Sequence, residues 1–87
     1  MELFSEIEKS FSKIEKLFST EELLEFKNTS RDYLWLYHFG IGTWIRNYLL
    51  TEKSKLYQLF IDNKITHKDD MSTLIIEKFH EHISNSP

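Results

Sequence analysis

The fold of this chain depends on residues 33–50, which read YLWLYHFGIGTWIRNYLL. On an α-helical wheel the apolar side chains of this run occupy almost the whole circumference, so the sequence predicts a central, nearly all-apolar helix. Gly40 and Gly42, the two glycines of the chain, fall inside it. Two glycines weaken a helix by roughly 2 kcal/mol relative to alanine. We therefore expect a close backbone contact, a kink or a ligand at this point.

The rest of the chain predicts an all-α fold. Its 87 residues are enough for one core, so we expect a single helical domain over residues 1–87. No strand-type alternation of useful length occurs, and apolar residues recur at helical spacing on both sides of the central run. The expectation is a small bundle of about five helices around the central one. The other four fall at residues 3–18, 20–28, 56–61 and from 67 into a frayed tail at 83–87.

Short polar residues mark where these helices begin and end. Ser19 and Glu22 match a capping box, in which the serine accepts from the backbone and the glutamate reaches back. Asn63 suits a left-handed C-cap after the short fourth helix. The other expected N-caps are Thr29 or Ser30 for the central helix and Thr66 or His67 for the last helix.

Charge and composition exclude several classes of protein. Acidic residues outnumber basic ones by 14 to 11, so the net charge is −3 and no general positive field would gather nucleic acid. The chain has no cysteine, which excludes disulfides and thiolate metal sites. We expect no cofactor, no metal and no nucleic-acid partner.

The apolar run is not expected to cross a membrane. Residues 33–50 include His38, Arg46 and Asn47 and fall short of about 20 apolar residues. The N-terminus is acidic and amphipathic, whereas a secretory signal is basic and then continuously apolar. We therefore expect a cytoplasmic protein with no membrane contact.

Two motifs of the chain resemble those of a known family. Residues 38–47 read HFGIGTWIRN and residues 65–72 read ITHKDDMS, followed by a helix that includes Phe79 and His80. This arrangement resembles a family of small bacterial proteins of unknown function, with an H-F-G-x-G-x-W-I-R-N core and a downstream H-P-D-D-M-S helix start. Lys68 stands where that family has proline, a residue suited to the first helical position. The resemblance covers about the C-terminal two thirds and leaves the first helix outside; it implies a fold and a site but no activity.

Arg46 is the strongest candidate for a particular role. A guanidinium in a mostly buried helix must be paired and hydrogen-bonded, because an unpaired buried charge is very costly. Asp69 and Asp70, at the start of the last helix, are the natural partners. In this interpretation Arg46 is a structural clamp that fastens the last helix to the central one.

A ligand site is the alternative to the clamp. His38, Gly42 and Arg46 follow one another at intervals of one helical turn, so they can share a face. Arg46, Asn47 and His38 would then converge on a small anionic ligand or a partner carboxylate, and Gly42 would permit its approach. Both interpretations remain open at this point.

Enzyme and metal sites have weaker support. Ser72 and His80 invite a hydrolase interpretation, but eight helical residues separate them, a rise of roughly 12 Å. Glu77 and His80 have the spacing of a di-iron motif, yet such sites need two copies and only one exists here. The candidate binding residues are His38, Gly42, Arg46, Asn47, Asp69, Asp70, Ser72 and His80, with no catalytic residue and no metal ligand among them.

These observations lead to two classes of function. The leading one is a non-enzymatic, cytoplasmic, helical protein-interaction module, because Trp, Tyr and Arg anchor interfaces and the central run holds more aromatic residues than one helix can easily bury. Its partner is another protein or a second copy of the chain, as a homodimer. An accessory, regulatory or inhibitor role, such as toxin immunity or phage anti-defence, fits this class. The alternative is a small anionic-ligand-binding or enzyme site built on His38, Arg46, Asn47 and Asp69 or Asp70.

Overall fold

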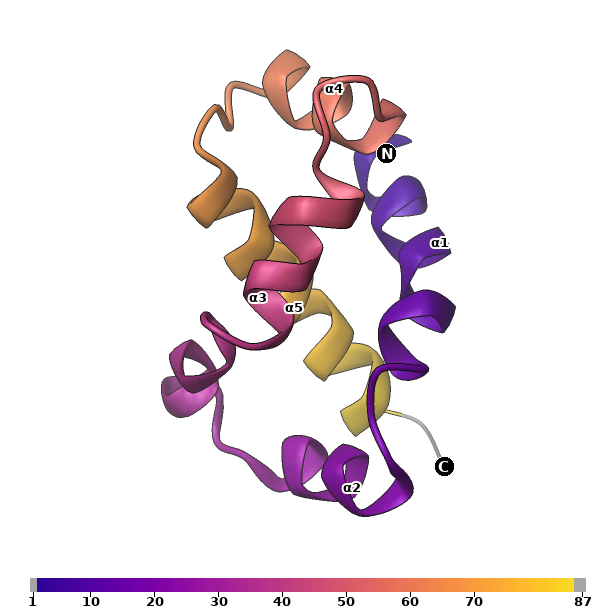
Figure 1. The fold of residues 1–87 in the computed structure, drawn as a ribbon, viewed down its shortest axis with the longest axis vertical. Helices are drawn as coiled ribbons and strands as arrows, with labels where there is room; N and C mark the ends of the chain where they lie inside the picture. Colours follow the sequence, from indigo (N-terminus) through magenta and orange to yellow (C-terminus); the bar gives the residue numbers. More distant parts are fainter. Residues whose placement is uncertain (1, 86–87) are drawn as a thin grey trace.

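Residues 2–85, the part of the chain described by the computed structural model, contain helices and no strand (Figure 1). The expected all-α fold class is confirmed. The Cα radius of gyration is 12.4 Å, close to the value of about 12 Å for a compact chain of this length. In chain order the elements are α1 (Glu2–Glu15), α2 (Thr20–Asn28), the 3-10 helix η1 (Arg31–Tyr37), α3 (Ile41–Trp44), the π-helical turn η2 (Ile45–Leu49), α4 (Lys55–Asp62) and α5 (Lys68–Ser84).

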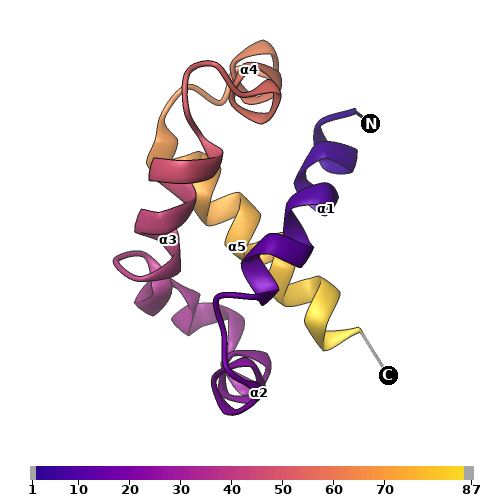
Figure 2. The ribbon, with the colours of Figure 1, turned by 45° about the vertical axis from the view of Figure 1, so that its right-hand side comes forward.

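The last helix, α5, is the centre of the fold. It contacts α1, α2, η1, α3 and η2, and Figure 2 shows it running between α1 and α3. Met71, Ile75 and Phe79 on this helix are completely buried. The short helices α2 and α4 lie at opposite ends of the long axis in Figure 1. The helix around which the others pack is therefore α5, and the expectation that residues 33–50 form the central helix is wrong.

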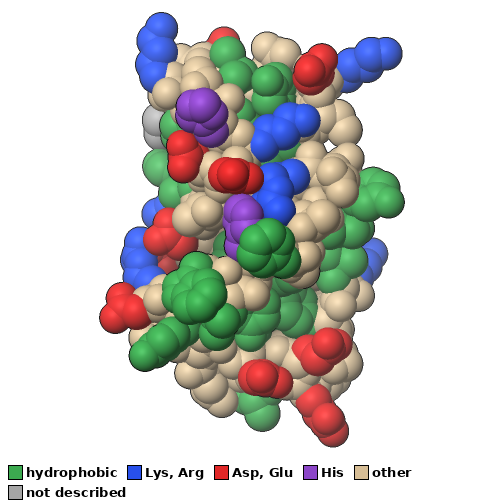
Figure 3. Space-filling view, turned by 60° about the vertical axis from the view of Figure 1, so that its left-hand side comes forward, with side chains coloured by type: hydrophobic (Ala, Val, Ile, Leu, Met, Phe, Trp, Pro, Cys, Tyr) green, Lys and Arg blue, Asp and Glu red, His purple; other side chains and the backbone are tan. Residues whose placement is uncertain are grey.

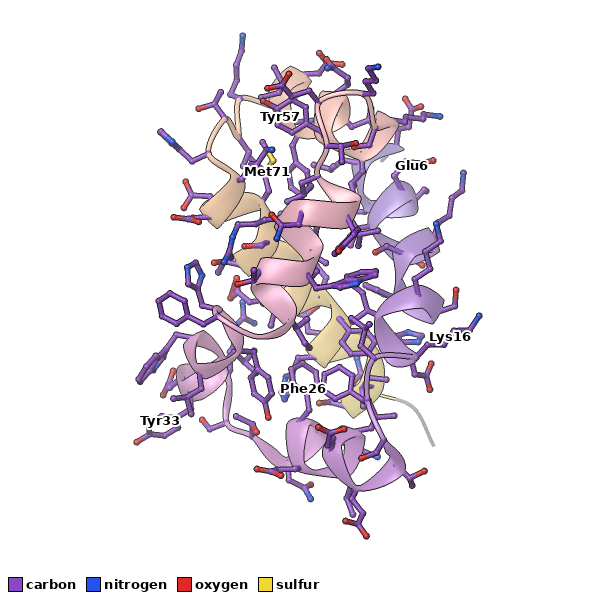
Figure 4. All side chains as sticks on the ribbon, in the orientation of Figure 1. Glu6, Lys16, Phe26, Tyr33, Tyr57 and Met71 are labelled. Carbon is purple, nitrogen blue, oxygen red and sulfur yellow. The ribbon has the colours of Figure 1, made fainter. Side chains whose placement is uncertain are left out.

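Phenylalanine rings fill the core between α1, α2 and α5. The ring of Phe79 has its centroid 5.6 Å from that of Phe11 and 5.4 Å from that of Phe26. Phe18 adds a stacked contact to Phe79 at 6.0 Å. Figure 4 shows Phe26 pointing from α2 into the interior. Such aromatic pairs contribute about 0.5–1.5 kcal/mol each beyond their buried area, so they stabilise a small chain that has no disulfide.

The helix ends follow the polar residues of the sequence at most positions. The capping box is confirmed: Ser19 Oγ accepts from the Glu22 amide at 3.1 Å, and Glu22 accepts from the Ser19 amide at 2.9 Å. The expected left-handed C-cap at Asn63 is wrong: Asn63 has a φ of −96°, and Lys64, the next residue, adopts the positive φ of 69°. The Asn63 side chain instead donates to the Leu59 carbonyl at 2.7 Å. Of the other expected N-caps, Ser30 precedes η1 and His67 precedes α5.

Residues 33–50 do not form one buried helix. They are divided into the end of η1, a turn at residues 38–40, α3 and η2. Five large apolar side chains of the run are more than half exposed: Tyr33, Trp35, Leu36, Phe39 and Tyr48. Much of the run is therefore directed to the surface. The expected kink near the glycines is confirmed, because the chain turns at Gly40, directly before α3.

The 3-10 geometry of η1 explains which of its side chains are exposed. With about three residues per turn, side chains three positions apart lie in one row. Leu34 and Tyr37 form the inward row: Leu34 is buried, and the ring of Tyr37 packs edge-on against Phe26 at 4.8 Å. Tyr33 and Leu36 form an outward row and are exposed. The α-helical wheel failed here because it assumed 3.6 residues per turn.

Helix α5 continues through the segment that was expected to fray. Ile83 is buried, Ser84 is the last helical residue, and the Asn85 amide donates to the Glu81 carbonyl at 3.0 Å. The expectation was wrong for residues 83–85 because burial of the Ile83 side chain holds the last turn in place. Ser86 and Pro87 lie outside the described residues.

No helix within residues 2–85 has the length and apolar character needed to cross a membrane. The longest, α5, has 17 residues and begins with the charged sequence Lys68-Asp69-Asp70. For this part of the chain the expected lack of a membrane span is confirmed.

Candidate functional site

The side chain of Arg46 connects η2 to the turn after η1 and to the start of α5. Its Nη1 donates to Ser72 Oγ at 3.1 Å and lies 3.3 Å from His38 Nδ1. Its Nη2 donates to the His38 carbonyl oxygen at 3.0 Å and to Thr43 Oγ1 at 3.1 Å. Each terminal nitrogen therefore has two acceptors, and only 16% of the side chain is exposed. We call Arg46, His38, Thr43 and Ser72 the Arg46 clamp.

The two hydroxyl groups of the clamp are oriented by the backbone of their own segments. Ser72 Oγ donates to the Asp69 carbonyl at 3.1 Å, and Thr43 Oγ1 donates to the Phe39 carbonyl at 2.9 Å. A hydroxyl has one proton to donate and lone pairs to accept with. Because both protons are used in this way, the lone pairs of Ser72 and Thr43 are left to accept from Arg46.

The geometry also assigns the tautomer of His38. A guanidinium can only donate, so the contact from Arg46 requires His38 Nδ1 to be the acceptor and places the ring proton on Nε2. His38 Nε2 lies 4.0 Å from Asp69 Oδ1, the same carboxylate oxygen that lies 3.7 Å from Arg46 Nε. The Asp69 side chain is 72% exposed, so solvent screens its charge at both contacts. The clamp is thus held mainly by neutral acceptors and not by the carboxylates that the sequence suggested.

Gly42 allows Arg46 to approach the backbone closely. A Cβ atom at this position would lie 3.0 Å from Arg46 Nη1 and 3.2 Å from the Tyr37 carbonyl oxygen. A Cβ atom at Gly40 would meet nothing within 4 Å. The expected close contact is therefore confirmed at Gly42, whereas Gly40 marks the turn.

The structure brings together five of the eight predicted site residues: His38, Gly42, Arg46, Asp69 and Ser72. The side chains of Asn47 and Asp70 are exposed and make no hydrogen bond or ion pair with the rest of residues 2–85. Each follows a residue of the site directly, and successive helical side chains point in different directions. The expected pairing of Asp70 with Arg46 is accordingly absent.

His80 lies apart from the clamp. It is eight residues beyond Ser72 on α5, and its ring packs edge-on against Phe26 at 5.3 Å. Its Nε2 atom is buried and has no hydrogen-bond partner within the described residues. Ser72, for its part, is hydrogen-bonded to Arg46 and to the Asp69 carbonyl. The structure therefore brings no serine–histidine pair together here, in line with the rise estimated from the sequence.

Sequence reasoning missed two features of this region. Thr43 belongs to the clamp, and its position three residues before Arg46 on one helix is a signal that could have found it. Arg31 donates to Glu77 at 3.0 Å and to Glu81 at 3.3 Å, which fastens the start of η1 to α5. These partners lie 46 and 50 positions apart, so no local spacing indicates them.

A hollow of about 480 Å³ lies beside the clamp, between η1 and α5. Leu34, Trp35 and Ile76 line it with apolar surface, and Arg31 and Glu77 border it with charge. His38 also lines the hollow, so the clamp and the hollow share this side chain.

Two exposed aromatic side chains, Trp35 and Phe39, line the hollow, and Tyr33 and Leu36 are exposed on the outward row of η1. We call these four side chains the η1 patch. Figure 4 shows Tyr33 pointing away from the ribbon. When this side of the molecule is turned forward, green apolar side chains gather on it next to charged and histidine side chains (Figure 3). Phe39 packs edge-on against the His38 ring at 4.9 Å, which joins the patch to the clamp.

The groups with displaced pKa values lie elsewhere, on α1, α2 and α4. A hydrogen bond from Lys9 at 2.8 Å lowers the pKa of Glu6, and a hydrogen bond to Glu2 raises the pKa of Lys55. Lys55 is exposed and Glu6 is partly buried, and both belong to ion pairs between α1 and α4 or within α1, not to the clamp. Within residues 2–85, no three His, Asp or Glu side chains are placed to hold a metal ion.

A family model matches residues 5–83, which include every residue of the clamp and of the η1 patch. The family is described as a domain of unknown function (DUF6794). The chain belongs to this family. The DUF6794 match begins inside α1, so the first helix is part of the family domain, although the sequence motifs had placed it outside the resemblance. Comparison with curated proteins and with solved structures gave no match.

Proposed function

We propose that this protein is a helical protein-interaction module that acts by binding and not by catalysis, and that the η1 patch is its contact surface. The observation that carries the proposal is the exposure of three aromatic rings, Tyr33, Trp35 and Phe39, on one short segment. An accessory, regulatory or inhibitor protein would use such a surface.

The size and composition of the patch support this role. Aromatic side chains bury about 150–250 Å² each, so the exposed parts of these three rings amount to about 400 Å². The largest apolar patch of an ordinary monomer is about 300–600 Å² and is often functional. Tryptophan and tyrosine are also enriched among the residues that carry most of the binding energy at interfaces.

The Arg46 clamp supports the patch from behind. Arg46 holds the carbonyl oxygen and the ring of His38, and Thr43 holds the carbonyl oxygen of Phe39. The backbone on both sides of the Phe39 side chain is therefore fixed by hydrogen bonds. A contact residue that is already fixed loses less entropy on binding, which raises affinity.

The clamp offers little support for the alternative, an anionic ligand. Both terminal nitrogens of Arg46 already have two acceptors each within the protein. An anion would have to displace neutral groups that are held in place by their own hydrogen bonds. No observation favours a ligand over these acceptors.

Affinity capture with three baits tests the proposal. The baits are the wild type, the double variant Trp35→Ser/Phe39→Ser, and Tyr48→Ser as the matched control, since Tyr48 is an aromatic residue of similar exposure beside α1 and α4. We expect a protein that is captured by the wild type and by Tyr48→Ser and is lost with the double variant. Capture of the same proteins by all three folded baits would reject the η1 patch as the contact surface.

A further inference from the structure

We infer that the partner at the η1 patch is a second copy of this chain, bound about a twofold axis. The inference rests on the proposed function, because it takes the η1 patch to be a contact surface. In a twofold dimer the same surface is used by both copies, so that surface must be complementary to itself.

The shape of this face meets that requirement. The hollow between η1 and α5 lies beside protruding rings, and Phe39, which is 85% exposed, stands at its border. Two copies facing each other about a twofold axis can each place Phe39 against the apolar wall formed by Leu34 and Ile76 of the other. One chain therefore has both the protruding ring and the apolar hollow that would receive the ring of a second copy.

The charges around the hollow are also complementary to themselves. Arg31 is 63% exposed and contacts Glu77 and Glu81 through its two terminal nitrogens. Its neighbour Asp32 has a carboxylate that makes no ion pair within residues 2–85. At the start of one short helix, a cation thus lies next to an unpaired anion. A twofold axis near η1 would bring Arg31 of one copy towards Asp32 of the other. Opposite charges would then face each other at the contact, although each chain carries a net charge of −3.

The available area is sufficient for a dimer. A standard interface buries about 800 Å² on each partner. The chain exposes 5804 Å² in total, so such an interface would cover roughly a seventh of it. The exposed rings supply about half of that area, and the walls of the hollow with Leu36 and the charged border can supply the rest.

Sedimentation of the purified protein from about 10 nM to about 100 μM tests the inference, because interfaces of this size bind at micromolar concentration or below. We expect twice 10.6 kDa at the highest concentrations and a fall towards 10.6 kDa on dilution. Trp35→Ser/Phe39→Ser should weaken the dimer by on the order of 100-fold, and Tyr48→Ser by less than about threefold. A mass of 10.6 kDa at every concentration would overturn the inference.

Cross-linking locates the contact independently of the aromatic variants. The chain has no cysteine, so Thr73→Cys, at the wall of the hollow, gives a single reactive thiol. A short bis-maleimide should join two copies through this thiol and leave Tyr48→Cys monomeric, and the reverse pattern would reject the hollow as the interface. If the protein is monomeric and the patch variants still lose a captured protein, this inference fails while the proposed function stands. If neither dimer nor captured protein depends on the patch, both fail.

Discussion

The guanidinium of Arg46 and the carbonyl oxygen of His38 are joined by a 3.0 Å hydrogen bond that spans eight positions of the chain. The bond fastens the turn at residues 38–40 to η2, which follows it in the chain. Arg46 also donates to Ser72 on α5, so one side chain holds the turn, η2 and α5 together. The rigidity of this region therefore depends on a single residue with several neutral partners.

Arg46→Ala should lower the free energy of unfolding by about 3 kcal/mol, because the buried hydroxyl of Ser72, the partly buried His38 and the Thr43 hydroxyl lose a charged donor together. For a domain of this size the loss corresponds to a fall in Tm of roughly 12–24 °C. Arg46→Lys should also destabilise the protein, since one ammonium group cannot reach four acceptors in a planar arrangement. Thermal denaturation measures both variants.

Asp69→Asn is the matched control for the Arg46 variants. The carboxylate is largely exposed, so we expect a change below about 1 kcal/mol. If Asp69→Asn were as damaging as Arg46→Ala, the clamp would depend on the ion pair and not on neutral acceptors.

Thr43→Val and Thr43→Ser form a second matched pair. Valine keeps the shape of threonine but removes the hydroxyl that accepts from Arg46 and donates to the Phe39 carbonyl. We expect Thr43→Val to lose about 1 kcal/mol, and Thr43→Ser, which keeps the hydroxyl, to remain near the wild type. Urea denaturation monitored by tryptophan fluorescence gives both values. A larger loss for Thr43→Ser than for Thr43→Val would mean that the methyl group and not the hydroxyl matters.

Gly42→Ala should destabilise the protein by about 1–3 kcal/mol, although alanine is the better helix former. The new Cβ would press on the Tyr37 carbonyl oxygen, which belongs to the backbone and cannot move aside as a flexible side chain can. Gly40→Ala adds the same methyl group in open space and serves as the control. A smaller fall in Tm for Gly40→Ala is expected, and the opposite order would show that the close contact at Gly42 relaxes easily.

The sequence identified the parts of this fold that depend on local spacing. The capping box at Ser19 and Glu22 follows from residues three positions apart. The placement of Arg46 on one face with His38 follows from helical spacing, and its contact with the start of the last helix follows from the need to neutralise a buried charge, although its main partners there are neutral groups and not the expected carboxylates. Gly42 was found for a similar reason, since an unfavourable glycine in an apolar run requires a compensating contact.

The sequence could not indicate where the run at residues 33–50 changes its helical geometry. Tyr33, Leu34 and Leu36 are all apolar, and only the three-residue repeat of η1 decides that Leu34 is buried while the others are exposed. That repeat depends on contacts between η1 and α5, such as those of Arg31, and these link residues far apart in the sequence. The η1 patch therefore emerged only from the three-dimensional structure.

Glu22→Gln should remove a pH-dependent part of the stability. The Ser19 amide donates to the Glu22 carboxylate and lowers the pKa of Glu22 below its ordinary value of 4.5. A carboxylate whose pKa is lowered by folding stabilises the native state above its unfolded pKa, and this stabilisation is lost as the pH falls through the folded pKa. Tm should therefore be lower for Glu22→Gln than for the wild type near pH 7, and the difference should shrink below about pH 4.5.

Glu21→Gln controls for the general effect of charge near the start of α2. Glu21 is also in the first turn of this helix but makes no side-chain hydrogen bond within the described residues. Its variant should show a weaker pH dependence than Glu22→Gln. Parallel Tm curves for the two variants would assign the effect to the helix dipole alone.

His80→Leu should stabilise the protein. The Nε2 atom of His80 is buried with no hydrogen-bond partner in residues 2–85, and a leucine of similar size would keep the packing against Phe26 without an unsatisfied polar atom. Replacing such a group with an apolar one should raise the free energy of unfolding by about 1 kcal/mol, or Tm by roughly 4–8 °C. His67→Leu, at an exposed position before α5, should change Tm little. A fall in Tm for His80→Leu would mean that the ring makes a polar contact in solution, and such a contact would make His80 a candidate for function after all.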